Sequence, residues 1–180
     1  KKFNNLKIFF NPEFLTEANF INDFKTQNRI IIGSSDNNFS IINDLYIESF
    51  PGVKIIKCSL KEAELVKYFT NSFLALKVSY GNEFFNLCKK LDIDYDVVVN
   101  IATHDQRIGK SHFTVPGPDG KFGFGGACFP KDLNAIIDVF EKNGLNPYIL
   151  KAAWKRNISE DRKEKDWEKL IGRAITENNE

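Results

Sequence analysis

The amino-acid sequence predicts an α/β segment followed by an all-α segment. Up to residue 58, short apolar runs of strand length alternate with a helical pattern, and from residue 59 onward the apolar spacing is that of helices. One helical stretch in the second part, residues 60–90, contains no proline. We therefore expect two domains, residues 1–58 and residues 59–180.

Three apolar runs in the first segment have the length and composition of buried strands: residues 6–10, 29–33 and 53–57. Between the last two, residues 37–50 carry apolar side chains three or four positions apart, as in a helix. A strand–helix–strand order with continuously apolar strands favours a parallel sheet covered on both faces. The Gly-x-Gly-x-x-Gly turn that opens a dinucleotide-binding unit does not occur in the sequence, so the predicted sheet is incomplete.

The helix expected at residues 60–90 is apolar almost all round between residues 68 and 80. Such a helix has to be buried on more than one side, which a small domain rarely achieves alone. We therefore expect a homodimer that forms through this helix. Further helices are expected at residues 94–103, 130–143 and 147–175, after an irregular stretch at 104–126, and the mixed charges between 155 and 169 indicate a solvated helix face.

The composition argues against several classes of function. The chain has 25 Lys and Arg against 24 Asp and Glu, a net charge of +1, so no polybasic surface for nucleic acid is expected. Apolar runs are short and interrupted by charge, so neither a membrane-spanning segment nor a secretory signal is predicted. Three widely spaced cysteines favour a reducing, cytoplasmic compartment, and two histidines without a Cys-x-x-Cys pair argue against a metal site.

Residues 123–132, with the sequence GFGGACFPKD, carry the strongest functional signal. Pro130 suits the first turn of a helix, which places Cys128 at the helix N-terminus, where the dipole and free N–H groups favour a thiolate. Asp132 follows one turn later on the same face. Most cysteines outside disulfides are small buried hydrophobes, and we interpret Cys58 and Cys88 in that way. The glycines and the Pro-Lys-Asp turn favour a nucleophile for Cys128.

Two further pairs of polar residues have helical spacing. Glu13 and Glu17 follow the first strand-like run, and Lys67 and Asn71 lie on one face of the long helix. Each pair also has an ordinary structural explanation, because the glutamates could be exposed loop charges and Lys67 could extend to solvent. Asn71 could satisfy a buried carbonyl.

Together these residues resemble the UDP-glucose/GDP-mannose dehydrogenase family. The matching pieces keep the family's order and cover nearly the whole chain: NPEFLTE (11–17), AELVKYFTNSFLALK (63–77), DQRIG (105–109), PGPDGKFGFGGACFPKD (116–132) and AAWKRN (152–157). The resemblance implies the end of a Rossmann-like NAD-binding domain followed by a central helical dimerisation domain. The Phe-Pro-Lys-Asp ending is more similar to the branch of the family that oxidises UDP-glucose.

The resemblance also implies a four-electron oxidation of UDP-glucose to UDP-glucuronate with two NAD molecules. In this chemistry Cys128 attacks the aldehyde formed first, and the thiohemiacetal is oxidised to a thioester that water hydrolyses. Lys67 and Asn71 would stabilise an oxyanion at C6. Asp132 would orient or activate water beside the cysteine, and Glu13 would act as general base for thioester hydrolysis.

The family's binding positions carry over residue by residue. Arg107 would reach across the dimer interface to the partner's substrate, a role that suits its planar fork. Glu17 and Lys131 would lie near the cofactor. The matching substrate-binding positions are Phe14, Leu15, Lys67, Asn71, Arg107, Phe124 and Gly125.

The sequence departs from the family pattern at both ends. The glycine fingerprint is missing, no UDP-binding domain follows the AAWKRN motif, and the chain holds no methionine. We therefore expect a piece of a longer enzyme that is inactive alone. Three alternatives stay open: a dehydrogenase of GDP-mannose or a UDP-aminosugar, a non-catalytic dimerisation module, and an unrelated thiol hydrolase that uses Cys128 with His112 as base.

Overall fold

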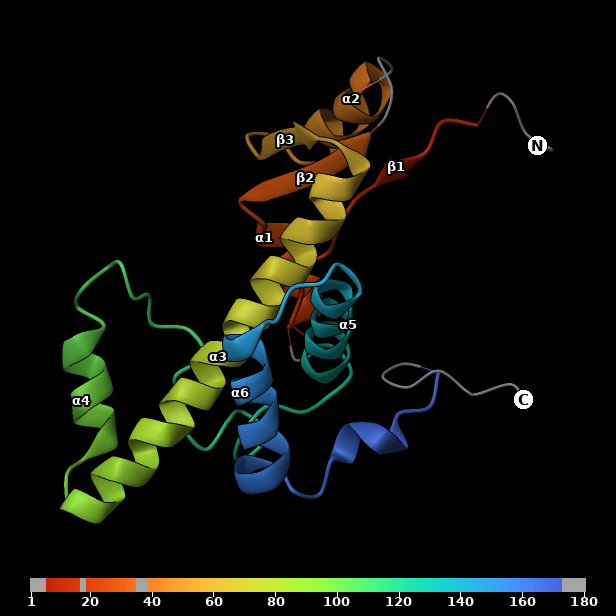
Figure 1. The fold of residues 1–180 in the computed structure, drawn as a ribbon. Coiled ribbons are helices and arrows are strands. Elements are labelled where there is room, and N and C mark those ends of the chain that lie inside the picture. Colours follow the sequence, from red (N-terminus) through yellow and green to blue (C-terminus); the bar gives the residue numbers. More distant parts are fainter. Residues whose placement is uncertain (1–5, 17–18, 35–38, 173–180) are drawn as a thin grey trace. The chain divides into compact units, whose positions relative to one another are not determined.

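The structure is a computed structural model that describes residues 6–16, 19–34 and 39–172 (Figure 1). Its contacts divide the chain into two compact units, residues 1–69 and 70–180, with the division inside the long helix α3 (Leu60–Leu91). The domain boundary that the sequence predicts at residues 58 and 59 stays a prediction. The first unit holds β1 (Phe9–Phe10), α1 (Phe20–Thr26), β2 (Arg29–Ser34), α2 (Phe39–Ser49), β3 (Lys54–Cys58) and the start of α3.

β2 is the middle strand of a three-stranded sheet with the order β1-β2-β3. β2 and β3 are parallel, with Ile31 opposite Ile56, which confirms the parallel pairing expected from the sequence. Residues 30–32 of β2 are at most 6 % exposed. A strand buried on both faces has no polar side to present, which explains its unbroken apolar run.

The edge strand β1 differs from the expected strand at residues 6–10. It is two residues long and antiparallel to β2, with Phe9 opposite Ser34. Pro12 follows and has no N–H to donate to a ladder, so the pairing ends there. The side-chain amide of Asn11 donates instead to the carbonyl of Ile31 at 2.7 Å, which holds the segment after β1 against β2.

The start of α3 is capped and packed against the sheet. The Glu62 carboxylate accepts from the N–H of Ser59 at 2.7 Å, and the Ser59 hydroxyl accepts from the N–H of Glu62 at 3.2 Å, a reciprocal capping box. One residue later, Ala63 is fully buried against β2. A Cβ atom on Gly33 would lie 2.7 Å from the Cβ of Ala63, so only small residues fit at this contact.

The second unit is all-helical, as the sequence predicts. After the rest of α3 it holds α4 (Tyr95–Ala102), α5 (Phe129–Lys142), α6 (Tyr148–Arg156), the π-helical turn η1 (Asn157–Asp161) and the 3₁₀ turn η2 (Asp166–Lys169). The Asp94 side chain caps α4 by accepting from the N–H groups of Asp96 and Val97. The Tyr95 hydroxyl donates to the carbonyl of Phe113 at 2.7 Å, which joins α4 to the irregular stretch before α5.

The last helix is shorter than the sequence predicts. The sequence favours one helix over residues 147–175, but α6 ends at Arg156 and continues as a π-helical turn. Most charged side chains between residues 155 and 169 are exposed, as expected, but the interpretation as a solvated face is wrong for Arg162, which is 2 % exposed. The chain leaves the helix because the Arg162 side chain is directed into the interior, where it meets its ion-pair partners.

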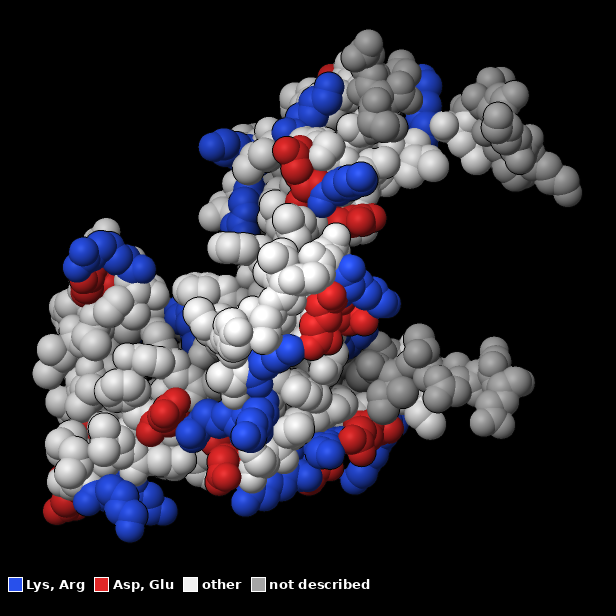
Figure 2. All heavy atoms as spheres, in the orientation of Figure 1, with Lys and Arg blue, Asp and Glu red and all other residues white. Residues whose placement is uncertain are grey.

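Charged side chains of both signs are interspersed on the face shown in Figure 2, in keeping with the net charge of +1. None of the helices in the described part of the chain is long and apolar enough to cross a membrane.

The contact between Ala63 and Gly33 yields a prediction about stability. Ala63→Leu adds three carbon atoms where a single extra methyl on the facing residue already has no room. Overpacking of this kind costs about 1–3 kcal/mol, so the free energy of unfolding should fall by that amount. Urea denaturation followed by circular dichroism measures the change.

Lys61→Leu is the matched control, because it places the same leucine at an exposed position of the same helix turn. Its free energy of unfolding should stay within about 0.5 kcal/mol of the parent value. Equal stabilities for the two variants would contradict the tight contact between α3 and β2.

Candidate active site

Cys128 lies where the sequence places it, at the N-terminal end of a helix. It is the N-cap residue of α5, its side chain is exposed, and Pro130 occupies the first turn. The Cys128 carbonyl accepts from the N–H of Asp132 at 2.9 Å, which closes the first turn. The positive end of the helix dipole stabilises negative charge at this position. The geometry therefore suits a cysteine that reacts as a thiolate.

Asp132 is a buried carboxylate one turn beyond Cys128. It is 3 % exposed, and its two oxygens have different partners. The side-chain amide of Asn71 on α3 donates to Oδ2 at 2.5 Å, and the ammonium of Lys131 lies 3.1 Å from Oδ1. Asn71 and Lys131, predicted to face substrate and cofactor, thus both contact the carboxylate that accompanies Cys128. The structure brings these three polar side chains together, and their roles at a site stay predictions.

The first unit holds a second group of the predicted residues. The Lys67 ammonium donates to the backbone carbonyl of Glu13 and to its carboxylate, the latter at 2.9 Å. The other carboxylate oxygen of Glu13 accepts from the N–H of Leu15 at 2.8 Å. The ring of Phe14 lies beneath two cations, with the Arg29 guanidinium 5.1 Å and the Lys67 ammonium 5.5 Å from its centre. Four of the five predicted residues of this unit therefore form one cluster.

Glu17, the fifth predicted site residue of the first unit, lies outside the described residues.

Arg107 stands on an exposed loop after α4. Its side chain is 90 % exposed and forms a forked pair with Asp105. Lys77 of α3 holds this loop, because its ammonium donates to the carbonyls of Ile108 and Gly109 at 3.3 and 2.9 Å. Burial lowers the pKa of Lys77. Contact of Arg107 with a partner subunit stays a prediction.

Phe124 and Gly125 lie in the loop that leads to Cys128. The Phe124 ring is buried, with its centre 6.3 Å from that of Trp154, and its peptide group is hydrogen-bonded by Asn157. Gly125 packs on the guanidinium of Arg162. Contact of these two residues with a substrate stays a prediction.

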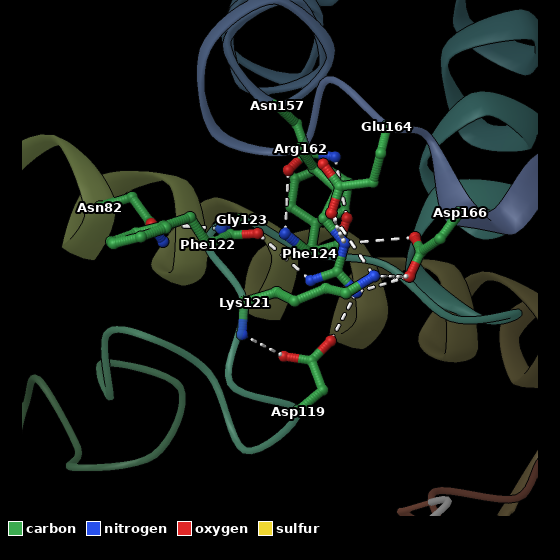
Figure 3. Close-up of polar contacts among 10 residues, drawn as sticks. All are labelled: Asn82, Asp119, Lys121, Phe122, Gly123, Phe124, Asn157, Arg162, Glu164 and Asp166. Carbon is green, nitrogen blue, oxygen red and sulfur yellow. Dashed lines mark hydrogen bonds and ion pairs between the residues drawn. The ribbon is translucent and has the colours of Figure 1, made fainter.

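An ion-pair cluster around the buried Arg162, beside this loop, was not expected from the sequence (Figure 3). Arg162 donates to the carboxylates of Asp119 and Asp166, and the Lys121 ammonium lies 3.4 Å from Asp166 and 3.5 Å from Glu164. The pKa of Asp166 is lowered, chiefly because Arg162 donates to its carboxylate. Burial raises the pKa of Asp119, but the hydrogen bonds from Arg162 and from the backbone of Lys121 outweigh it and lower the pKa overall.

His112 packs against the residue that follows Cys128, with ring centres of His112 and Phe129 5.7 Å apart. Burial, with a smaller contribution from the charge of Lys77, lowers the pKa of His112. Among residues 6–16, 19–34 and 39–172, no three His, Cys, Asp or Glu side chains gather as metal ligands would.

Comparison with known proteins connects this site to one family. Residues 61–159 match the central domain of the UDP-glucose/GDP-mannose dehydrogenase family. The chain is 39 % identical over 147 residues to the UDP-glucose 6-dehydrogenase of Rickettsia conorii, a match that covers 82 % of this chain and 33 % of that protein. It is 36 % identical over 152 residues to a UDP-glucose 6-dehydrogenase of Haloferax volcanii, covering 82 % and 34 %.

Among solved structures, a UDP-glucose dehydrogenase from the hyperthermophilic archaeon Pyrobaculum islandicum matches with a TM-score of 0.76 and 39 % identity, over 84 % of this chain and 34 % of that one. The chain therefore spans about a third of the length of these relatives.

The ion pairs of Arg162 predict how stability depends on pH. Asp166→Asn removes a carboxylate whose pKa in the folded protein lies below its ordinary value of 3.8. Such a group stabilises the fold above its unfolded pKa, and the contribution is lost as the pH falls through the folded value. At pH 7 the variant should lose about 1.5–3 kcal/mol, the range for hydrogen bonds to charged groups, and urea denaturation at pH 7, 5 and 3 should show this difference shrinking below pH 4.

Glu168→Gln serves as control, because Glu168 is exposed and only pairs with Lys165 at 3.9 Å. This change should alter stability by less than about 0.5 kcal/mol at each pH. A loss for Asp166→Asn that is as large at pH 3 as at pH 7 would show that charge is not what the carboxylate contributes.

Proposed function

The chain belongs to the UDP-glucose/GDP-mannose dehydrogenase family, and we propose that it is the part of an NAD-dependent UDP-glucose 6-dehydrogenase that carries the reactive cysteine. The observation that carries the proposal is the exposed Cys128 at the start of α5, one turn before a buried carboxylate that α3 holds. Because the chain spans only about a third of its relatives, the complete activity is proposed for a longer enzyme.

The proposed reaction is a four-electron oxidation at C6 of the sugar. The alcohol loses a hydride and a proton and becomes an aldehyde. The Cys128 thiolate adds to the aldehyde carbon, and the oxyanion takes up a proton to give a thiohemiacetal. Loss of a second hydride and a proton yields a thioester, and water then hydrolyses it to the carboxylate, the free thiolate and two protons. In the complete enzyme NAD is the acceptor of both hydrides.

The roles of the other residues follow from their positions. The Asn71 amide and the Lys67 ammonium can stabilise an oxyanion at C6 through hydrogen bonds and charge. Asp132 can orient water for thioester hydrolysis, because Asn71 and Lys131 fix the directions of its two oxygens. Glu13 is the proposed general base, and its contact with Lys67 holds its carboxylate in place.

The residues of this chain fit only the edge of an NAD site. Lys131, the matching cofactor position among the described residues, holds Asp132, and the sequence has no glycine-rich turn that would bind the pyrophosphate. The second matching position, Glu17, lies outside the described residues. We therefore assign the roles above to this chain's residues and derive none of them from the cofactor.

We also propose that the enzyme is a homodimer through α3. From residue 70 on, α3 buries polar residues such as Asn71 and Lys77 and exposes an apolar stripe. The stripe consists of Phe73, Tyr80, Phe84, Leu87 and Leu91, each 38–58 % exposed. Its spacing of three, four and seven residues is that of a helix that packs against another helix. A second copy of the same stripe is the natural partner.

Other assignments are less well supported. A dehydrogenase of GDP-mannose or of a UDP-aminosugar would use the same thiol chemistry, and binding measurements with each nucleotide sugar distinguish them. Only the apolar stripe favours a non-catalytic dimerisation module, and this hypothesis does not explain why Asn71 and Lys131 both contact the carboxylate of Asp132. A thiol hydrolase with His112 as base would show an alkylation rate of Cys128 that follows a histidine titration. Cys58, Cys88 and Cys128 form no disulfide with one another, which is in keeping with a cytoplasmic enzyme.

The assignment of Cys128 as nucleophile is tested in the complete enzyme. Cys128→Ala should lower the formation of UDP-glucuronate at least about 100-fold, because no thiohemiacetal can form. Aldehyde should be released or retained in its place. Intact-protein mass spectrometry after mixing with UDP-glucose and NAD should detect an acyl adduct on the parent enzyme and none on the variant.

Cys88→Ala is the matched control, since Cys88 is buried in a cluster with Tyr95 and Val115. It should lower stability and leave the acid-forming rate nearly unchanged. Near-normal acid formation by Cys128→Ala would show that the thiol mechanism is wrong.

The dimer is tested by sedimentation of the chain at micromolar concentration. The parent should sediment as a dimer, and Leu87→Lys should shift it toward monomer, because a charge in the stripe has to be desolvated when the helices meet. Asn86→Lys adds the same charge at the neighbouring exposed position outside the stripe and should leave the dimer intact. A monomeric parent, or equal effects of the two lysines, would refute an interface at this stripe.

A further inference from the structure

The loop before Cys128 is held by side chains from distant parts of the second unit. The N–H of Gly123 donates to the Asn82 side chain at 3.1 Å, and the N–H of Phe124 donates to the Asn157 side chain at 2.8 Å. The Asn157 amide donates back to the Phe124 carbonyl at 2.9 Å. Figure 3 shows Asn157 and Asn82 reaching the loop from different elements. The backbone N–H groups of Gly123 and Phe124 and the carbonyl of Phe124 are thus bonded to side chains rather than to a neighbouring strand.

Arg162 completes this arrangement. Its guanidinium donates to the carbonyl of Phe122 at 3.2 Å, and the same group contacts Asp119 and Asp166. One planar side chain therefore joins three segments: the turn at 117–121, the loop and the 3₁₀ turn η2. Arginine can do this because its five N–H donors point in fixed directions in one plane.

Burial makes these contacts strong constraints on the loop. Asn82, Asn157 and Arg162 are each at most 2 % exposed, so water cannot replace a lost partner. The glycines are required by the same packing. A Cβ on Gly125 would lie 2.6 Å from Cζ of Arg162, and Gly123 has a positive φ of 65° while a Cβ there would collide with Asn157.

The held loop ends three residues before Cys128. Gly125 rests on the guanidinium, Gly126 has φ of 70°, and α5 begins at Phe129. Asn157 and Arg162 therefore help to set the direction from which the chain enters α5. Asn82 also bonds the N–H of Gly123, and the rings of Phe122 and Phe124 pack against Phe85 and Trp154.

We propose that Asn157 and Arg162 are positioning residues for Cys128, acting through the backbone of residues 122–125. The proposal rests on the proposed function, in which the Cys128 sulfur has to meet an aldehyde carbon. A displacement of about 1 Å at a reacting atom costs on the order of 100-fold in rate. The first oxidation of the alcohol does not use the sulfur, so only the second half of the reaction depends on this placement.

The test compares the two half-reactions in the complete enzyme. Arg162→Lys keeps the positive charge and loses the planar fork, and Asn157→Asp keeps the acceptor for Phe124 and loses the donor. Both should slow oxidation of the UDP-glucose 6-aldehyde to the acid about 10- to 100-fold, with conversion of the alcohol to the aldehyde changed less than about 3-fold. Alkylation of Cys128 by iodoacetamide, measured without substrate, should change its rate at least about 3-fold.

Arg156→Lys is the matched control. Arg156 is one residue before Asn157 and pairs with Asp161 at 3.0 Å, and within the described part of the chain its side chain forms no hydrogen bond or ion pair with residues 122–125. It should leave both half-reactions and the alkylation rate within about 2-fold. Asp119→Asn serves if Arg162→Lys does not fold, because Asp119 is half-exposed and its loss only loosens the guanidinium.

Two outcomes overturn the inference: equal slowing of both half-reactions, or an unchanged alkylation rate in folded variants. Either would mean that Asn157 and Arg162 serve stability alone. Failure of the parent enzyme to oxidise UDP-glucose would instead refute the proposed function, and the alkylation rates would still decide the role of the two residues.

Discussion

The rest of the second unit depends on the burial of one guanidinium. An unpaired charge in the interior is very costly, so Arg162 is tolerated only because two carboxylates and a carbonyl surround it. Bringing these partners together requires the chain to leave helical geometry after Arg156 and to turn back at residues 162–166. The π-helical turn and the left-handed Lys165, with φ of 44°, follow from that requirement.

The same cation explains why the loop before Cys128 needs no regular secondary structure. A loop with unpaired backbone groups in the interior would be unstable. Here the side chains of Asn82, Asn157 and Arg162 take the place of a strand partner, and glycine at residue 125 allows the guanidinium to approach the backbone. Irregular backbone can therefore be rigid, which a nucleophile at the end of the loop requires.

The two groups of predicted polar residues each find their partners within their own unit. Lys67 has Glu13 as its partner, and Asn71 has Asp132. Both lysine and asparagine are therefore occupied, and an oxyanion would have to share or replace these partners. Sharing is chemically reasonable, since an ammonium has three N–H donors and an amide has two. The contacts thus orient Lys67 and Asn71 without using all of their donors.

Local signals predicted a large part of this structure. The glycines, Pro130 and the spacing to Asp132 concern neighbours within ten residues, and they correctly placed Cys128 at a helix N-terminus. The sequence also predicted β2 and α3. A strand buried on both faces has an unbroken apolar run, and the long helix keeps its helical spacing of apolar residues without a proline. A strand at residues 6–10 was expected, but the shortness of β1 and its antiparallel pairing were not, because two paired residues carry no period.

The Arg162 cluster could not be read from the sequence for a physical reason. Arg162 and Asp166 are four residues apart, the spacing of an ion pair on a solvated helix, so the pattern pointed to the surface. What places Arg162 inside is Asp119, 43 residues earlier, and such a long-range pair leaves no periodicity. The one local feature that pointed to this region was the AAWKRN motif, whose Asn157 follows the last residue of α6. The buried Asn157 bonds the backbone of Phe124, which lies 33 residues earlier in the sequence. A buried polar residue at the end of a helix is therefore best tested first for a hydrogen bond to the backbone of a distant loop.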